Sequence, residues 1–482
     1  MADLVSVFAA TAARMGEATA LIAPGQRIGF AALDARARGF AGVCAKRGLR
    51  RGDRVLVAMP VGVDLFVALA GLWRLGAVVV FPEPAMGLAG LRHAVRMTRP
   101  RAMVASGAYR WLRLLPWLWR CRLLTPRSSD TGTPPERTLS GQDLALISFT
   151  SGSTGAPKAI PRSHGFLMAQ YRAVAPLLEG GAGQVDLVAF PVFTLVNLAE
   201  GRASVLPDWP LSRPEAVTGP ALARWIGESG ATRALLPPAL VAALAEGPPP
   251  PALQTVFTGG GPVTPALVDR LCAARPGLRV LSVYGSTEAE PIAELDWADI
   301  DTTAREAMRT GAGLLAGRPV PGLHLRIRED EIQVAGPHVN AGYLDPAQDA
   351  GAKIREGGMV WHRTGDAGRL DALGRLWLLG RHTAIAEGPQ GRIYPFAAEL
   401  AAETWPGVRR AALWNGAGGP LLAIEGREAD PEACRARAAA LGIPRIETLE
   451  AIPLDRRHRS KVDYAALGAL LSGRRNVLQG KA

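Results

Sequence analysis

Cysteine, lysine and long apolar runs are all scarce in this chain of 482 residues. The four cysteines are scattered and form no C-x-x-C pair, which argues against disulfides and structural zinc and favours a reducing cytoplasm. No uninterrupted apolar run approaches the roughly 20 residues of a membrane-spanning helix. Residues 1–22 include Asp3, Arg14 and Glu17 and lack a basic start, so we expect no secretory signal there.

Lysine supplies only five of the 55 basic residues, and arginine supplies the others. The net charge of +12 is compatible with an anionic partner, and equally with solubility alone. No aromatic-basic RNA motif is present, so we expect no nucleic-acid partner. Two of the five lysines, Lys158 and Lys461, fall inside the motifs described below.

The length of the chain implies two or more domains, because a single core does not grow to this size. Residues 54–59 and 77–81 read as buried strands on either side of a helical segment, residues 63–75. This order predicts a right-handed parallel α/β unit. Similar alternation returns over residues 185–290, and a β-rich section with strands near 331–334 and 376–379 follows.

The most informative stretch follows an apolar run, Leu144 to Phe149, and is a loop of glycines and hydroxyl residues. Glycines leave room for a ligand, hydroxyls and freed amides donate hydrogen bonds, and a lysine adds positive charge. This combination suits a polyphosphate, although a plain polar turn has a similar composition. A proline precedes the lysine, so we expect no helix to begin inside the loop, unlike the P-loop of nucleotide hydrolases. The candidate phosphate-binding residues are Thr150, Ser151, Gly152, Ser153, Thr154, Gly155 and Lys158.

A second motif, S-V-Y-G-S-T-E-A over residues 282–289, follows an apolar strand. A strand that ends in polar groups places them at the carboxyl edge of a parallel sheet, where ligands bind. The alternative is a helix cap at Ser286 or Thr287. Upstream, Gly259, Gly260 and Gly261 follow another strand and would let a flat ring approach the backbone.

Two further motifs lie closer to the C-terminus. Residues 361–366 read W-H-R-T-G-D and precede a Gly-Arg pair at 380–381, although Gly-Asp and Asp-Ala-Leu-Gly are also common hairpin turns. Residues 452–463 form a basic segment that contains Lys461, and an exposed basic cluster is the alternative interpretation.

In this order, T-S-G-S-T-G-x-P-K, Y-G-S-T-E, T-G-D with its Gly-Arg, and the late lysine resemble the adenylate-forming superfamily of acyl-CoA synthetases, peptide-synthetase adenylation domains and luciferases. The resemblance covers residues 150–461 and implies an ATP-dependent, AMP-forming ligase that activates a carboxylic acid with ATP and Mg2+. The implied fold is α/β. Residues 1–380 would form a large N-terminal domain of layered α/β subdomains with a β-rich section, and residues 381–482 a small mobile α+β domain.

The resemblance also implies roles for the catalytic candidates. Thr287 would touch the α-phosphate, and Glu288 would hold Mg2+, a cation that prefers oxygen ligands. Lys158 would bind phosphate. Lys461 would swing in to bind the carboxylate and neutralise the charge that develops as it attacks phosphorus.

The nucleotide itself would be held by residues of three motifs. Tyr284, followed by Gly285, would stack near the adenine, beside the turn of Gly259, Gly260 and Gly261. Asp366 would accept both ribose hydroxyls. Arg381 would contact ribose or phosphate and begin the hinge between the two domains.

The chain departs from most of the superfamily after this hinge. Thr383 stands where most members have Asp or Lys. Most members also have the pattern G-x-R further on, whereas residues 391–395 read G-R-I-Y-P, with no residue between the glycine and the arginine. In CoA ligases of the superfamily this stretch helps to form the thiol channel. The residue before the late lysine is often glycine in the superfamily, and here it is Ser460. Residues 360–366, 380–383 and 455–461, together with 186–194 and 205–208, resemble the β-lactone synthetases of bacterial olefin biosynthesis.

Such enzymes adenylate a β-hydroxy acid, whose own hydroxyl closes a four-membered lactone and expels AMP. A fatty-acyl-CoA ligase, with CoA as a further substrate, remains an alternative. A third possibility is an inactive relative that binds a membrane surface or a nucleic acid through its positive charge. The fatty chain would lie between the phosphate loop and residues 186–262. The candidate lining residues, which suit a plain core equally, are Phe190, Phe193, Leu195, Val196, Leu198 and Leu236.

Residues 109–122 interleave tryptophan and leucine with arginine. Such a segment can lie on a membrane surface, and the cytoplasmic protein would then be a peripheral membrane protein. A helix–turn that covers the core is the alternative, and Pro116 would break a single helix in either case.

Overall fold

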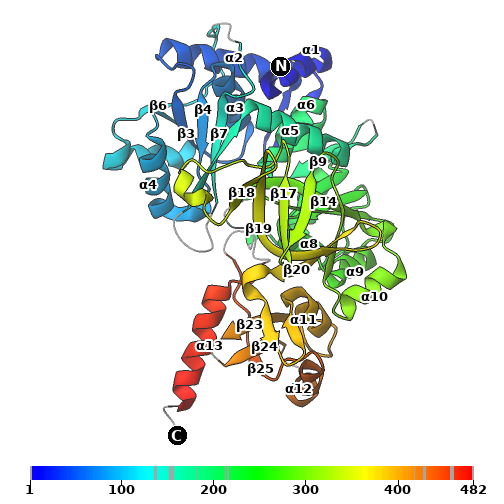
Figure 1. Ribbon diagram of the computed structural model, residues 1–482. Helices are drawn as coiled ribbons and strands as arrows, with labels where there is room; N and C mark the ends of the chain where they lie inside the picture. The colour runs from blue at the N-terminus through cyan, green and yellow to red at the C-terminus, as the bar shows by residue number, and fades with distance from the viewer. Residues whose placement is uncertain are drawn as a thin grey trace.

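A computed structural model describes residues 3–134, 138–150, 157–181, 183–211, 213, 216–416, 418–426, 430–455 and 461–479. The chain forms a six-stranded sheet near the N-terminus, a larger mixed sheet, and a small C-terminal unit (Figure 1). Among the described residues, no helix combines the length and apolar character that crossing a bilayer requires.

The first sheet has the strand order β6-β5-β3-β4-β7-β8. Its strands are β3 (Arg54–Ala58), β4 (Val78–Phe81), β5 (Ala102–Ala105), β6 (Arg122–Leu124), β7 (Leu144–Thr150) and β8 (Lys158–Ser163). β3 and β4 are parallel and are joined by α3 (Val63–Arg74), which confirms the predicted strand–helix–strand unit. The neighbouring helices are α1 (Leu4–Met15), α2 (Phe30–Lys46) and α4 (Gly87–Thr98).

The larger sheet changes from parallel to antiparallel pairing along its length. Its strands are β1 (Thr19–Ala23), β2 (Gln26–Gly29), β9 (Val185–Val188), β10 (Ala203–Val205), β11 (Arg233–Leu236), β12 (Thr255–Gly259), β13 (Arg279–Ser286), β14 (Ala289–Asp296), β15 (Leu314–Pro319), β16 (His324–Arg328), β17 (Glu331–Ala335), β18 (Lys353–Glu356), β19 (Met359–Leu370) and β20 (Leu376–Arg381). Strands β1, β10, β9, β11, β12 and β13 pair in parallel, in that order, and β13 to β20 pair antiparallel.

Helices cover the parallel part of this sheet, so its central strands are buried on both faces. These helices are α5 (His164–Val174), α6 (Pro191–Glu200), α7 (Gly219–Ser229), α8 (Pro238–Leu244), α9 (Pro265–Ala274) and α10 (Thr302–Arg309). Every residue of β11 and β12 is buried. The buried Arg233 of β11 is paired through two hydrogen bonds of 2.7 Å with the carboxylate of Asp186 in β9, so its charge is compensated.

The C-terminal unit has its own small sheet and core. Its elements are β21 (Ala386–Gly388), β22 (Gly391–Ile393), α11 (Pro395–Ala402), β23 (Arg410–Gly416), β24 (Gly419–Glu425), α12 (Pro431–Ala440), β25 (Ile446–Leu449) and α13 (Tyr464–Gln479). Buried Leu413, Leu422 and Ile424 pack together with Ala438 of α12. Figure 1 shows this unit below the large sheet, with α11 nearest to β20.

The helix-cap interpretation of Ser286 and Thr287 is wrong. Ser286 ends β13, and Thr287 and Glu288 form the turn that leads into the antiparallel strand β14. Ser and Thr are common both in helix caps and in tight turns, so the residue types alone do not distinguish a helix cap from a turn.

Candidate active site

The candidate phosphate loop joins the two strands of a hairpin. β7 and β8 are antiparallel, and Thr150 lies opposite Lys158 where the loop leaves the hairpin. Lys158 is the first residue of the strand β8. Its Nζ lies 4.7 Å from the centre of the Tyr343 ring. The remaining candidates of the loop lie outside the described residues: Ser151, Gly152, Ser153, Thr154 and Gly155.

The glycine turn and the Y-G-S-T-E motif lie on adjacent parallel strands. Gly259 ends β12 opposite Val283 of β13, and Gly260 and Gly261 continue the turn. A Cβ atom on Gly259 would lie 2.4 Å from the carbonyl oxygen of Val283, so only glycine allows this close pairing. The turn is therefore held beside Tyr284 and Gly285 at the same edge of the sheet.

Tyr284 connects this edge to the T-G-D motif. Its hydroxyl donates a hydrogen bond of 2.8 Å to Oδ2 of Asp366, and Nη1 of Arg381 lies 3.3 Å from Oδ1 of the same carboxylate. Asp366 and Arg381 face each other across β19 and β20. Burial and the neighbouring carboxylate raise the pKa of Tyr284 well above its usual value, so the phenol stays protonated. Three predicted site residues from two separate motifs thus meet at one point.

Glu288 is anchored by a segment that the sequence did not single out. The hydroxyl of Tyr343 donates to Oε1 of Glu288 at 3.1 Å, and the backbone N–H of Asn340 donates to the Glu288 carbonyl oxygen at 2.7 Å. Nη2 of Arg162 donates to the carbonyl oxygen of Thr287 at 2.6 Å. The turn that carries both candidate catalytic residues is therefore fixed from two sides.

Lys353 lies next to this anchor and was also missed as a site residue. Its ammonium group donates a hydrogen bond to the carbonyl oxygen of Asn340 and lies 5.2 Å from the centre of the Tyr343 ring. Burial lowers the pKa of Lys353 to about 8, although the carboxylates of Glu288 and Asp349 act in the opposite direction. Because the chain has only five lysines and two of them lie in the motifs, each remaining lysine could have been considered as a candidate site residue.

The described residues of the fourth motif lie in the C-terminal unit, where Asp455 and Lys461 contact each other. The backbone N–H of Lys461 donates to Oδ1 of Asp455 at 3.0 Å, and the N–H of Asp455 donates to the Lys461 carbonyl oxygen at 2.8 Å. Residues 456–460, including Ser460, lie outside the described residues. These contacts hold the backbone of Lys461 beside Asp455, and the reach of the Lys461 side chain to a carboxylate stays a prediction.

A magnesium ion would depend on ATP for most of its ligands. Within the described part of the chain, no three His, Cys, Asp or Glu side chains gather closely enough to hold a metal. A single carboxylate such as Glu288 nevertheless fits Mg2+, which commonly binds one or two carboxylates together with phosphate oxygens and water.

The predicted acyl-pocket residues do not share one space. Phe193 and Val196 pack with Phe257, whereas Leu198 belongs to the N-terminal core and Leu236 to the core of the large sheet. For these four side chains the plain-core interpretation holds.

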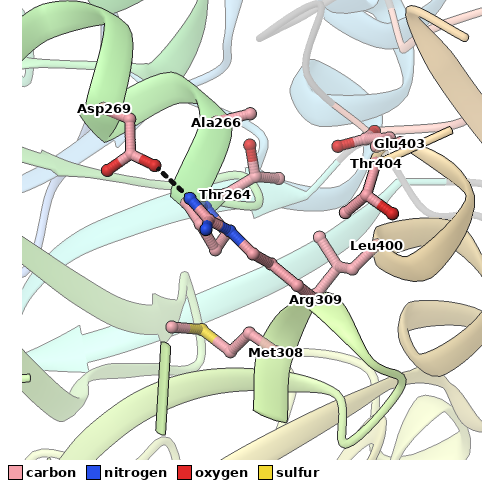
Figure 2. A pocket seen from close by; sticks show the side chains of 9 residues that line it. Thr264, Ala266, Asp269, Met308, Arg309, Leu400, Glu403 and Thr404 are labelled. Atoms are coloured by element: carbon pink, nitrogen blue, oxygen red, sulfur yellow. Dashed lines mark hydrogen bonds and ion pairs between the residues drawn. The ribbon is translucent and has the colours of Figure 1, made fainter. Parts of the chain in front are cut away.

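A cavity of about 340 Å³ lies elsewhere, between the N-terminal part and the C-terminal unit (Figure 2). Its lining comes from the start of α9, the end of α10 and α11. Arg309 reaches across it to Asp269 at 2.8 Å, while Glu403 lies on the C-terminal side. The cavity thus marks the contact between the two units rather than the nucleotide site.

The chain thus has a large, partly parallel sheet with a small additional α+β unit, and the candidate phosphate hairpin and the Tyr284–Asp366–Arg381 group lie on strands of its sheets, an arrangement expected of a nucleotide-binding α/β enzyme. The chain belongs to the AMP-binding enzyme family, whose family model matches residues 8–344.

Two curated relatives are similar over nearly their whole length. The chain is 32% identical to an olefin beta-lactone synthetase of Stenotrophomonas maltophilia, over 95% of this chain and 94% of the relative. It is 31% identical to an olefin beta-lactone synthetase of Xanthomonas campestris, over 90% and 89%. The chain is therefore an ATP-dependent, AMP-forming enzyme that activates a small-molecule carboxylic acid.

Solved structures support the fold. The amide bond synthetase McbA from Marinactinospora thermotolerans aligns with a TM-score of 0.81 at 22% identity, over 97% of this chain and 99% of that one. O-succinylbenzoate coenzyme A synthetase from Bacillus subtilis, in complex with ATP and a magnesium ion, aligns with a TM-score of 0.78 at 20% identity, over 96% and 99%. Enzymes of this family use ATP and Mg2+.

Proposed function

We propose that this enzyme adenylates a β-hydroxy fatty acid and that the hydroxyl of the substrate then closes a β-lactone. The observation that carries the proposal is the nearly full-length similarity to two olefin beta-lactone synthetases. Thr383 and the short segment at 391–395, where CoA ligases differ, support an acceptor other than an external thiol.

In the first step, a carboxylate oxygen of the acid attacks the α-phosphorus of ATP, and pyrophosphate leaves with the electron pair of the broken bond. Positioning and electrostatics supply most of the rate in such a transfer. The loop from Thr150 to Lys158 would hold the phosphates, Thr287 the α-phosphate, and Asp366 with Arg381 the ribose. Mg2+ on Glu288 would neutralise charge on the phosphates.

In the second step, the β-hydroxyl oxygen attacks the acyl carbon, AMP leaves with the electron pair of the acyl–oxygen bond, and the hydroxyl proton passes to solvent.

We place the domain boundary at residue 381 and infer that the C-terminal unit rotates about residues 381–383 between the two steps. Lys461 would bind the carboxylate in the first step and withdraw before the second.

The test is a reaction with ATP, Mg2+ and a β-hydroxy fatty acid in the absence of CoA. We expect AMP and a product whose mass is that of the acid minus water, or the alkene left after its decarboxylation. The matching fatty acid without the hydroxyl is the control and should give an adenylate but no lactone. Release of AMP only after addition of CoA would support the CoA ligase instead.

We further propose that the enzyme docks on an anionic membrane surface through residues 109–122 and the adjacent α4. The segment folds as two short 3-10 helices, Gly107–Leu114 and Pro116–Leu118, and buries Leu118 against the first sheet. Trp111, Leu114 and Trp119 nevertheless keep 71%, 67% and 67% of their surface exposed. Membrane-surface segments expose such apolar side chains beside cations.

The charge around these side chains suits an anionic bilayer. No Asp or Glu occurs between Glu83 and Asp130, whereas nine arginines do. On α4, Leu88 is 61% exposed, and Arg92 and Arg96 follow at helical spacing and are also exposed. The patch thus combines exposed apolar side chains with a local excess of positive charge, which suits binding to acidic lipids.

Sedimentation with vesicles tests this docking. We expect binding to vesicles containing phosphatidylglycerol, weak binding to pure phosphatidylcholine, and loss of binding when Trp111 and Trp119 are both replaced by serine. Leu373→Ser removes another leucine that is 58% exposed and should bind like the wild type. Failure to bind either vesicle, or binding only to an acidic protein or to RNA, contradicts the proposal.

A further inference from the structure

Lys353 lies beside the Glu288 end of the site, although none of the motifs contains it. It is the first residue of β18 and is paired with His362 of β19. Its ammonium group donates to the Asn340 carbonyl oxygen and lies over the Tyr343 ring, 5.2 Å from the ring centre. Lys353 therefore ties β18 to the segment from Asn340 to Tyr343.

That segment is the one that holds Glu288. Asn340 contacts the backbone of Glu288, and Tyr343 contacts its carboxylate. Lys158 of the phosphate hairpin lies over the same Tyr343 ring, 4.7 Å from its centre. One aromatic ring thus contacts two lysines and the candidate metal-binding carboxylate.

An ammonium group in this position is costly, because removal from water disfavours its charge. The carboxylates of Glu288 and Asp349 are the nearby groups that favour the charged form, whereas Lys158 and Arg355 oppose it. Arginine outnumbers lysine throughout the chain, so composition does not account for a lysine here. A compact ammonium fits between a carbonyl oxygen and a ring face where a planar guanidinium needs more space.

We propose that Lys353 is a positioning residue for Mg-ATP. It holds Asn340 and Tyr343 in the arrangement that orients Glu288, and its charge adds to that of Lys158 at the phosphate end of the nucleotide. This inference rests on the proposed assignment of Glu288 and Lys158 to that end.

Three variants test the proposal. Lys353→Met keeps the length of the side chain and removes its charge, and Lys353→Arg keeps the charge in another shape. Lys46→Met is the matched control, because Lys46 lies exposed at the end of α2. Each is measured for acid-dependent exchange of pyrophosphate into ATP, with separate KM values for Mg-ATP and for the acid.

We expect Lys353→Met to raise the KM for Mg-ATP about tenfold or more, since the variant loses both a hydrogen bond from a charged group and the charge itself. Lys353→Arg should recover part of this loss. The KM for the acid should stay unchanged, and so should the affinity for an acyl-sulfamoyl adenosine, which lacks the β- and γ-phosphates. Lys46→Met should behave like the wild type.

An unchanged KM for Mg-ATP in Lys353→Met overturns the proposal. An equal loss of affinity for Mg-ATP and for the sulfamoyl analogue also overturns it, since that result would show that Lys353 stabilises the domain as a whole rather than the phosphate end of the site. Absence of exchange in the wild type would instead contradict the proposed function. Calorimetric binding of Mg-ATP to the wild type and to Lys353→Met then still decides the role of Lys353.

Discussion

The hydroxyl of Tyr284 joins two motifs that are 82 positions apart in the chain. Through it, the edge of the parallel sheet meets the carboxylate that is our candidate for the ribose. The backbone N–H of Asp366 also donates a hydrogen bond of 3.1 Å to Oγ1 of Thr364, and Asp366 is paired with Arg381 across β19 and β20. At the scale of single residues, the site therefore depends on the orientation of one carboxylate.

Tyr284→Phe removes one of the two partners that the Asp366 side chain has among the described residues, Tyr284 and Arg381. Loss of a hydrogen bond to a charged, half-buried group is worth roughly 1.5–3 kcal/mol, so we expect the KM for ATP to rise about tenfold or more. Tyr171→Phe removes a comparable Tyr–carboxylate hydrogen bond, to Glu200, and serves as the control. Pyrophosphate exchange measures both, and equal KM values for the two variants would contradict a role of Tyr284 in nucleotide binding.

At the scale of elements, a buried carboxylate holds the C-terminal unit together. Glu399 of α11 accepts hydrogen bonds from the backbone of Leu413 in β23 at 3.0 Å and from the hydroxyl of Tyr464 in α13 at 3.1 Å. Burial nevertheless raises the pKa of Glu399 to about 7. The folded unit thus binds this proton more tightly than the unfolded chain does.

This shift predicts how the stability of the unit depends on pH. Because the pKa of Glu399 is higher in the folded unit than in the unfolded chain, its protonated form stabilises the fold. This contribution to the free energy of unfolding is complete below the ordinary pKa of 4.5 and is lost as the pH rises through about 7. Glu399→Gln keeps an acceptor oxygen without a charge, so its stability should fall less between pH 5 and pH 8. Some decline should remain, because burial also raises the pKa of Glu403 to about 7.

Hydrogen exchange of β23 and β24 measures this dependence, with Glu450→Gln at an exposed position as the control. Identical pH profiles for Glu399→Gln and the wild type would show that Glu399 is not the group responsible.

Elements with strong local patterns were predictable from the sequence, and contacts between distant segments were not. The apolar strands β3 and β4 and the helix between them follow from alternation and length alone. Glu288 and Asp366 stand in recognisable motifs. Tyr343 and Lys353 belong to the site only because β14 and the segment after β17 come together, as the Ala289–Val339 bridge shows. That contact depends on packing between residues about 50 positions apart, and the hydrophobic pattern of neither segment predicts it.

At the scale of the whole molecule, the two units meet through α11. This helix packs against β20, α10 and β15, and the cavity of Figure 2 lies along the same contact. Such an interface, which is only partly filled, suits two units that change their relative position. Gly380 and Arg381 end β20, the strand paired with Asp366 of β19, and the chain continues from them into the C-terminal unit.

Gly380 determines how closely α11 approaches β20. Its φ is +111°, and a Cβ atom there would lie 2.6 Å from Cβ of Pro395, the first residue of α11. We expect Gly380→Ala to push α11 away from the sheet, because backbone strain and a steric clash act together. Hydrogen exchange in α11 should therefore increase, and the rate of the complete reaction should fall.

Binding of AMP by the larger part of the chain should change little in Gly380→Ala, since Tyr284 and Asp366 lie outside α11. Gly374→Ala is the matched control: its φ of +71° is also positive, but no atom lies within 4 Å of the added Cβ. It carries the backbone strain without the clash. If both variants slowed the reaction equally, backbone strain alone would account for the loss, and close docking of α11 on β20 would not be required for turnover.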